Sequence, residues 1–483
     1  MKINILGSKN LNWLSITFFI LAIILILYLS FQYFILADFP IGQDVIYHLN
    51  RVLRVEREGL LSSFNLSVYP LSVIFLVGWH KFLDFLGLDL PRIFIFMECF
   101  YLFSVAMLSG ILSYKVFKDW RIAVITMILV ASSRWLNDYL RIGLMAEMLG
   151  LVFFIFALIM LFEKKWLWMI AAMALLFLSH PLPFFVFLLV FFSCAIFWFF
   201  SKKEKKKIAI LLVIIVSAFM IGAIYLFWPQ YIRTVLYYFH YYIGQKDGRG
   251  LIQYMIDYDK RRIIFYALGF LGVIWSLLKF KKTEKFWLFF IFSVLSFLIC
   301  FKQYLGIHYL SFRFYSYFEV AVAISAAYAI ANLGKMSGKW LTYAVILLLT
   351  FFCIYPNYWS NKEIINWQIH DEKSGNILPL AERNNAPLIK AMVNKNLFIY
   401  SHSTWVLWMK FVGLNTKNDW SFGGKFALNK KKSDQQWLDF FKKRKIGYIY
   451  FSSVDSKADI EKSQILKLIF NKDNIRLYEV KTK

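Results

Sequence analysis

Long apolar runs alternate with short polar segments over the first three quarters of the chain. Most runs have about 18 or more residues, which is enough to cross a bilayer as a helix. About twelve such spans are predicted, at residues 11–36, 67–86, 93–114, 120–135, 143–162, 166–180, 182–201, 208–228, 263–280, 286–301, 317–334 and 340–356. No alternating pattern of a membrane barrel accompanies them. The pattern therefore predicts an all-α polytopic membrane protein with about 11–13 transmembrane helices.

The pattern changes after Pro356, where the chain becomes polar and rich in Lys and Asn. Three apolar stretches in this part predict strands, "NLFIYS", "IGYIYFS" and "IRLYEV". Two others, "DQQWLDFFKK" and "DIEKSQILKLIF", predict helices with an Asp near the start. We therefore expect a transmembrane domain over residues 1–356 and a small soluble α/β domain over residues 357–483.

Five basic loops lie two spans apart from one another, so they are predicted to share one side of the membrane. They are residues 115–121, 163–165, 202–207, 279–285 and 335–339. Because cytoplasmic loops carry an excess of Lys and Arg, that side is expected to be the cytoplasm, and the C-terminal domain of this multi-pass cell-membrane protein extracytoplasmic. Lys2 and Lys9 also place the N-terminus inside. However, three spans separate the N-terminus from the first basic loop, so either an early segment is re-entrant or one span is missed or over-counted.

Composition supports a membrane protein and argues against a nucleic-acid partner. The chain is 60% hydrophobic, whereas soluble domains have about 45–50% apolar residues. The net charge of +26 falls largely in the short basic loops, where Lys and Arg contact anionic lipid. Since no nucleic-acid-binding motif accompanies this charge, we expect the lipid bilayer as a partner and no nucleic acid. The four cysteines lie inside apolar runs and are predicted to be small core residues.

The segment after the first span, residues 43–60, predicts an amphipathic helix that lies in the membrane interface. At 100° per residue, one side collects Asp44, His48, Arg51, Arg54 and Glu58. The other side collects Ile46, Leu49, Leu53 and Leu60. Asp44 lies near the helix start, where the dipole favours a carboxylate. Two interpretations stay open, an Asp cap on a solvated helix or a helix that turns its polar side toward a site.

Further polar residues occur at or near predicted spans. Asp138 and Arg141 lie in "RWLNDYLRIGLMAE", and Glu147 follows inside an apolar run. Glu98 lies in the middle of a span, in "FMECF". A carboxylate at membrane depth is costly unless it is paired or protonated. Such residues are functional candidates, and a hydrogen bond between two helices is the alternative.

Two later segments carry His and Arg. His180 opens "HPLPF" between two spans, and His308 and Arg313 lie in "IHYLSFRFYSYFE" before the eleventh span. The planar fork of Arg suits a phosphate oxygen. The alternatives are a hydrogen bond at a helix end for His180 and snorkelling to the interface for Arg313.

Taken in order, these segments resemble the GT-C superfamily of polytopic glycosyltransferases, which use polyprenyl-phosphate sugars outside the membrane. The resemblance covers roughly residues 11–356 and rests on "GQDVIYHLNRV", "YPLSVIFLVGW", "LNDYLRIGLMAE" and "SFRFYSYFE". The patterns D-x-x-x-H, R-x-G-x-x-A-E and "HP" look closest to prokaryotic membrane proteins labelled as related to 6-pyruvoyl-tetrahydropterin synthase, a label that implies no pterin chemistry. The first loop lacks an acidic pair and no "WWD" occurs, which speaks against a protein N-glycosylating enzyme.

The resemblance implies an integral-membrane glycosyltransferase that moves a sugar from a polyprenyl-phosphate donor to an extracytoplasmic glycan, lipid or protein acceptor. Asp44 would be the general base. Asp138 would be the second catalytic residue, which orients the acceptor or holds a divalent cation, Mg²⁺ or Mn²⁺, together with Asp44. The implied substrate-binding residues are His48, Arg51, Arg141, Glu147, His180, His308 and Arg313. Two alternatives remain, a non-catalytic component of a surface-polysaccharide assembly system and a lipid or polysaccharide transporter.

Overall fold

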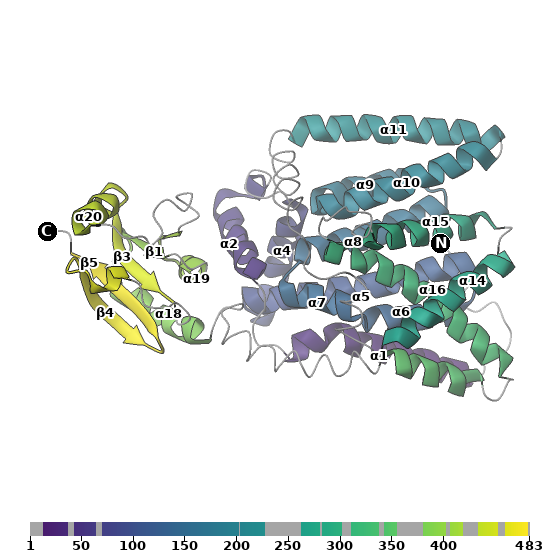
Figure 1. Cartoon of the computed structure of the whole chain (residues 1–483), viewed down its shortest axis with the longest axis horizontal. Helices are drawn as coiled ribbons and strands as arrows, with labels where there is room; N and C mark the ends of the chain where they lie inside the picture. The colour runs from purple at the N-terminus through teal and green to yellow at the C-terminus, as the bar shows by residue number, and fades with distance from the viewer. Residues whose placement is uncertain are drawn as a thin grey trace. The chain divides into compact units, whose positions relative to one another are not determined.

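The computed structural model describes residues 13–36, 43–63, 70–201, 203–227, 262–280, 283–301, 311–337, 342–354, 380–401, 406–418, 433–452 and 459–481. The backbone of Asp44, Asp138 and Arg141 lies within these ranges, but their side chains are not described. The chain divides into two compact units (Figure 1). The first comprises Met1–Asp38, Phe64–Leu140 and Leu144–Lys362, and the second comprises Phe39–Ser63, Arg141–Gly143 and Glu363–Lys483.

The first unit is a bundle of helices. They are α1 (Trp13–Leu36), α4 (Pro70–Leu83), α5 (Leu90–Phe117), α6 (Trp120–Ala131), α7 (Arg134–Ile142), α8 (Met145–Phe162), α9 (Trp166–Ser179), α10 (Pro181–Ser201), α11 (Lys203–Phe227), α14 (Ile263–Phe280), α15 (Glu284–Phe301), α16 (Tyr315–Met336) and the helix Thr342–Ile354. Short 3-10 turns are η1 (Asp84–Leu86) and η4 (Ser311–Phe314). Each of the twelve predicted segments coincides with one of these helices. Within the described ranges, 7 helices are long and apolar enough to cross a membrane. The predicted all-α membrane fold is confirmed.

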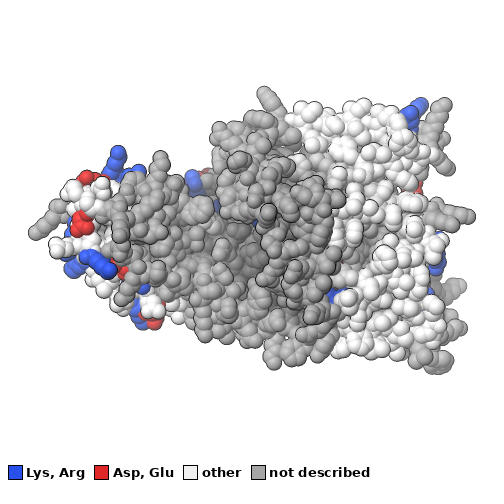
Figure 2. Space-filling model, viewed as in Figure 1, with Lys and Arg blue, Asp and Glu red and all other residues white. Residues whose placement is uncertain are grey.

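Long apolar side chains stay exposed along the outward faces of these helices. Examples are Leu21, Ile221 and Phe270, which are 60%, 69% and 70% exposed. The described flank of the bundle in Figure 2 is accordingly almost free of charged side chains, which gather toward its edge. Such a surface suits hydrocarbon, because a water-exposed protein rarely leaves a continuous apolar patch of this kind.

Ion pairs join four of the five basic loops at one end of the bundle, called the basic end below. The pairs are Lys115–Glu163 at 3.2 Å, Lys285–Glu163, Lys164–Glu284 at 3.2 Å and Lys335–Asp119 at 2.6 Å. The loops at 115–121, 163–165, 279–285 and 335–339 therefore share one side, as predicted. The fifth loop, residues 202–207, lies partly outside the described residues.

Helices α1 and α5 run antiparallel. Near the end of α1, Phe34 lies against Arg92 and Phe96 at the start of α5, whereas Phe31 also reaches Phe103 farther along. Since α5 ends at the basic end, α1 begins there and crosses to the opposite end. The chain thus leaves α1 and enters α5 at the same end. Because the chain leaves and re-enters the bundle at one end, the predicted span at 67–86, which corresponds to α4 (14 residues), makes no net crossing, as expected of a re-entrant segment.

The second unit contains α2 (Gln43–Glu58) and a sheet with flanking helices. Its other elements are α18 (Leu380–Met392), β1 (Phe398–Ser401), α19 (Val406–Phe411), β2 (Thr416–Asn418), α20 (Asp434–Lys443), β3 (Ile446–Phe451), η6 (Asp459–Lys462), β4 (Leu466–Lys472) and β5 (Ile475–Val480). The strand order is β2-β1-β3-β5-β4. Strand β1 is parallel to β2 and β3, whereas β5 is antiparallel to β3 and β4. The small α/β fold is confirmed, including three predicted strands and the helix α20.

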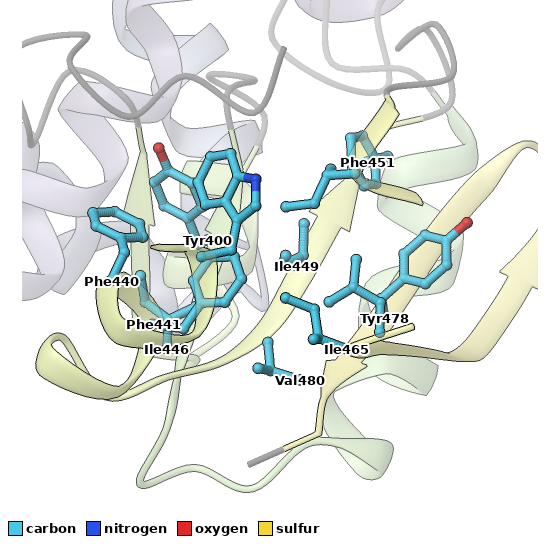
Figure 3. Close-up of a cluster of buried hydrophobic side chains, with 12 residues drawn as sticks. Tyr400, Phe440, Phe441, Ile446, Ile449, Phe451, Ile465, Tyr478 and Val480 are labelled. Carbon is cyan, nitrogen blue, oxygen red and sulfur yellow. The ribbon is translucent and has the colours of Figure 1, made fainter. Parts of the chain in front are cut away.

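Helices cover both faces of this sheet. Successive residues of a strand point to opposite faces, so each strand contributes side chains to two cores. Ile399 and Tyr448 belong to the core that also holds residues of α18 and α19. Tyr400 and Ile449, each one position later, belong to the core that holds the aromatic residues of α20 (Figure 3). A capping box of Ser433 and Gln436 starts α20.

The predicted helix at "DIEKSQILKLIF" is wrong in its second half. Only Asp459–Lys462 forms a helical turn, and Leu466–Lys472 is strand β4. Asp473 and Asn474 both have positive φ, 52° and 62°, and the flanking Lys472 and Ile475 pair across them. Two successive residues of this conformation make the tight turn of a β-hairpin. The hairpin pairs the segment with β5 and overrides its helical tendency.

Candidate functional site

At the end of the bundle opposite the basic end, Arg313 and Glu147 form an ion pair. The Nη1 atom of Arg313 lies 3.3 Å from Oε2 of Glu147, and the two side chains are 13% and 2% exposed. Glu147 lies in the first turn of α8, and Arg313 lies in η4, just before α16. Charged groups at such depth need a partner. Two residues that the sequence singled out separately are thus brought together.

Tyr139 of α7 connects the two sides of this pair. Its hydroxyl donates to the backbone carbonyl of Arg313 and lies 3.4 Å from Oε1 of Glu147. The hydroxyl of Ser316 donates to the same carbonyl at 3.3 Å. One side chain of α7 therefore contacts both the start of α8 and the segment that leads into α16.

A second buried ion pair lies at the same end and was missed by the sequence analysis. Glu319 of α16 accepts hydrogen bonds from Arg262 Nη2 at 2.5 Å, from the Tyr266 hydroxyl at 2.6 Å and from the Ser133 hydroxyl at 3.0 Å. The side chains of Arg262 and Glu319 are only 5% and 1% exposed. The signal was available, since Glu319 is a carboxylate inside the predicted span 317–334.

Helix α7 lies between the two pairs. Ser133 precedes it and caps its first turn, because its hydroxyl oxygen accepts from the backbone N–H of Leu136 at 3.4 Å. The ring of Trp135 meets that of Tyr315 edge-on, with centroids 4.7 Å apart. Asp138 also lies on α7, three positions after Trp135 and directly before Tyr139.

His180 occupies a helix end. It ends α9, is 5% exposed, and its Nδ1 accepts from the backbone N–H of Leu182 at 3.1 Å. A Cβ at Gly150 of α8 would lie 2.7 Å from Pro183 and 3.4 Å from His180, so the His-Pro corner packs tightly against α8 at this glycine. The helix-end alternative is observed, and a contact of His180 with substrate stays a prediction.

Helix α2 turns a different side inward than the sequence analysis predicted. His48 is buried together with Leu49, Val52 and Val55, so it does not belong to an exposed polar side. Burial lowers the pKa of His48 to about 3, and the nearby positive charge of Arg51 adds to this effect. The imidazole is therefore neutral at pH 7. The reason for the difference is tertiary, since α2 packs against α19 in its own unit.

The remaining polar side of α2 is exposed, with Arg54 Nε and Glu58 Oε1 2.7 Å apart. Arg51 is half-buried. Asp44 lies in the first turn of the helix, as predicted.

Glu98 of α5 is fully buried, and neither carboxyl oxygen has a hydrogen-bond partner in the described structure. The predicted alternative, a hydrogen bond between two helices, is therefore not observed for this residue.

The predicted site residues fall in both units. Glu147, His180 and Arg313 are described in the first unit, together with the backbone of Asp138; Asp44, His48, Arg51 and Arg141 belong to the second. His308 lies outside the described residues. Among the described residues, no group of three His, Cys, Asp or Glu side chains is placed to hold a metal ion. Since the side chains of Asp44 and Asp138 are not among them, a cation held by these two stays a prediction.

Comparison with known proteins identifies the architecture. No protein-family model and no curated protein sequence matches the chain. The apo oligosaccharyltransferase of Archaeoglobus fulgidus superposes with a TM-score of 0.60 and 12% identity, covering 91% of this chain and 70% of that one. The chain has a GT-C-like fold. The narrower likeness to the proteins labelled as 6-pyruvoyl-tetrahydropterin synthase-related stays a prediction.

Two further structures of the same archaeal enzyme are similar. One is a complex with an inhibitory peptide and a dolichol-phosphate, with a TM-score of 0.54, 12% identity and coverage of 91% of this chain and 70% of that one. The other is a complex with Zn and sulfate, with a TM-score of 0.52, 14% identity and coverage of 89% and 67%.

Proposed function

We propose that the chain is an integral-membrane glycosyltransferase that takes a sugar from a polyprenyl-phosphate donor and passes it to an extracytoplasmic acceptor. The observation that carries this proposal is the GT-C-like fold, shared over 91% of the chain with an enzyme whose structure includes a dolichol-phosphate. A dolichol-phosphate is itself a polyprenyl phosphate. The extracytoplasmic placement of the C-terminal domain belongs to the same proposal.

In this proposal Asp44 accepts the proton of an acceptor hydroxyl as the hydroxyl oxygen attacks the anomeric carbon. A general base acts from about 3 Å. The new bond joins acceptor oxygen and sugar, and the bond between the sugar and the phosphate oxygen breaks. Asp138 orients the acceptor. The carboxylates of Asp44 and Asp138 also fit a hard cation, Mg²⁺ or Mn²⁺, which would neutralise negative charge near them.

Arg313 is proposed to bind the departing phosphate, whose charge grows as the bond to the sugar breaks. Preorganised donors of this kind stabilise a transition state by several kcal/mol. Glu147 holds the guanidinium in place through the 3.3 Å contact. Arg141 and His308 would assist Arg313, and His48, Arg51 and His180 complete the proposed substrate contacts. The neutral imidazole of His48 can donate or accept a hydrogen bond but supplies no positive charge at pH 7.

The experiment supplies membranes that contain the full chain with synthetic polyprenyl phosphates carrying radiolabelled hexoses or pentoses. Release of polyprenyl phosphate and transfer of label are followed together, so that the acceptor need not be known. The proposal expects turnover with at least one sugar. The proposal is wrong if folded protein leaves every donor unchanged and also fails to bind polyprenyl phosphate.

The two alternative functions, a transporter and a non-catalytic scaffold, make different predictions. A transporter needs polar groups along a path through the membrane. In the described helices the ion pairs gather at the two ends of the bundle, and Glu98 is a lone buried carboxyl between them. This distribution favours a transferase. A non-catalytic scaffold would leave all labelled donors intact in the same assay.

A further inference from the structure

The geometry points to Glu319 as a positioning residue that fixes helix α7 and, through it, Asp138. This inference rests on the proposed function only for the role of Asp138, since the placement of α7 is a structural matter. Nothing in the sequence pattern assigned a role to Glu319, Arg262 or Ser133.

Glu319 joins three segments that are distant in sequence. Its donors are Ser133, 186 positions earlier, Arg262, 57 positions earlier, and Tyr266, 53 positions earlier. The carboxylate is 1% exposed and both oxygens are used. Hydrogen bonds to an ionised group are the strong ones, and they offset the cost of taking the charge out of water. The carboxylate of Glu319 therefore links the start of α7 to α14 and α16.

Helix α7 needs such ties. It has 9 residues, whereas an isolated helix shorter than about 12–15 residues is marginal. The Ser133 hydroxyl has one proton, which goes to Glu319, and its lone pair receives the N–H of Leu136. Glu319 thus orients the cap of α7. Asp138 follows Ser133 by about 7.5 Å along the helix axis, so a rotation of the cap moves it directly.

A second tie holds the other half of α7, where Tyr139 contacts Glu147 and the carbonyl of Arg313. That tie includes residues of the proposed binding site, so its loss would mix positioning with binding. Glu319 and Ser133 avoid this difficulty, because the structure gives them no contact with Arg313 or Glu147 among the interactions described above. Substitutions of Glu319 and Ser133 therefore test the positioning of α7 separately from binding by Arg313 and Glu147.

The test uses the full chain with four variants. Ser133→Ala removes the donor to Glu319, Ser133→Thr restores a hydroxyl, and Glu319→Gln removes the charge. Ser325→Ala is the matched control, since Ser325 is buried on the same α16 and, among the described residues, its hydroxyl donates to the carbonyl of Ala321 in its own helix. Hydrogen exchange of residues 134–142 and the kinetics of donor turnover are measured for each.

We expect Ser133→Ala to raise amide exchange in α7 roughly tenfold or more, with α5 unchanged. Glu319→Gln should raise exchange in α7 at least as much, and it should also lower global stability because it breaks the buried ion pair with Arg262. Turnover should fall roughly 10–100-fold at nearly constant KM for the donor, because a small displacement of a reacting group is costly. Ser133→Thr should recover most of the turnover and most of the protection of α7 from exchange, and Ser325→Ala should resemble the parent in both. Unchanged exchange in α7, or a loss expressed only in KM, overturns the inference. If the parent chain itself turns over no donor, the proposed function fails while hydrogen exchange still decides the positioning role.

Discussion

Arg313 and Glu147 lie 166 positions apart in the sequence, yet their side chains meet at 3.3 Å in a nearly buried ion pair. This contact joins the start of α8 to the segment before α16 at the end of the bundle opposite the basic end. Each residue alone had a simple structural explanation. Together they place a guanidinium, held in a defined position, at the end of the bundle where α1 ends.

Loss of the carboxylate in Glu147→Gln should destabilise the protein strongly. Arg313 would remain buried without its counter-charge, and breaking a buried pair costs about 3–5 kcal/mol. The matched control is Glu58→Gln, which removes an ion pair whose side chains are 54% and 46% exposed and should cost less than about 1 kcal/mol. Thermal unfolding in detergent measures both. Equal effects of the two variants would contradict a structural role for the Arg313–Glu147 pair.

Substitution of Arg313 should weaken binding of polyprenyl phosphate. Hydrogen bonds to charged groups contribute about 1.5–3 kcal/mol, so Arg313→Gln should lower affinity roughly 10–100-fold. Arg313→Lys should recover only part of it, because an ammonium cannot make the paired contacts of a guanidinium. Native mass spectrometry with polyprenyl phosphate and with the matching alcohol is the measurement. Arg121→Lys, at the basic end, serves as control, and a loss that is equal for phosphate and alcohol would argue against phosphate recognition.

The neutral buried His48 should make stability depend on pH. Its folded pKa of about 3 lies below the ordinary histidine value of 6.5. Between these values the unfolded chain binds more protons, so stability is full above about pH 6.5 and falls as pH falls toward 3. His48→Gln should remove this part of the acid sensitivity. Melting temperatures at pH 7.5 and pH 5 test it, and an identical drop in parent and variant would show that His48 is not the group responsible.

The re-entrant course of α4 predicts which loops are reached from outside. A cysteine in place of Leu86, which is 57% exposed after α4, should react with a membrane-impermeant maleimide on intact cells. A cysteine in place of Lys118, at the basic end after α5, should react only after the membrane is opened. The native Cys99, Cys194, Cys300 and Cys353 are all buried and give a low background. The reverse labelling pattern would place the basic end outside and the end of α4 inside, and would contradict this orientation of the bundle.

The sequence predicts well what local pattern controls. Apolar runs gave the positions of the spanning helices, because burial in hydrocarbon demands such runs. Helix α20 was predicted with its bounds from the stretch "DQQWLDFFKK" with an Asp at its start, and the structure adds a local capping box of Ser433 and Gln436. The unresolved parity of the spans required a tertiary fact, the antiparallel contact of Phe34 and Phe96.

The site was harder to predict from the sequence, because it also depends on tertiary contacts. Glu147 and Arg313 were candidates, but their pairing depends on helices that meet only in the folded bundle. Glu319 was overlooked beside the more conspicuous Arg313. His48 was assigned to the wrong side of α2, because its inward side is chosen by packing against α19 and not by the charge pattern.

The most direct measurement is donor turnover by Asp44→Asn, compared with Asp84→Asn at an exposed carboxylate outside the proposed site. Both substitutions remove one charge and keep the side-chain shape. The proposed chemistry predicts that Asp44→Asn lowers transfer roughly 100-fold or more, consistent with loss of a general base, while protein yield and binding of polyprenyl phosphate stay normal. Full transfer activity in Asp44→Asn, with Asp84→Asn equally active, would contradict it.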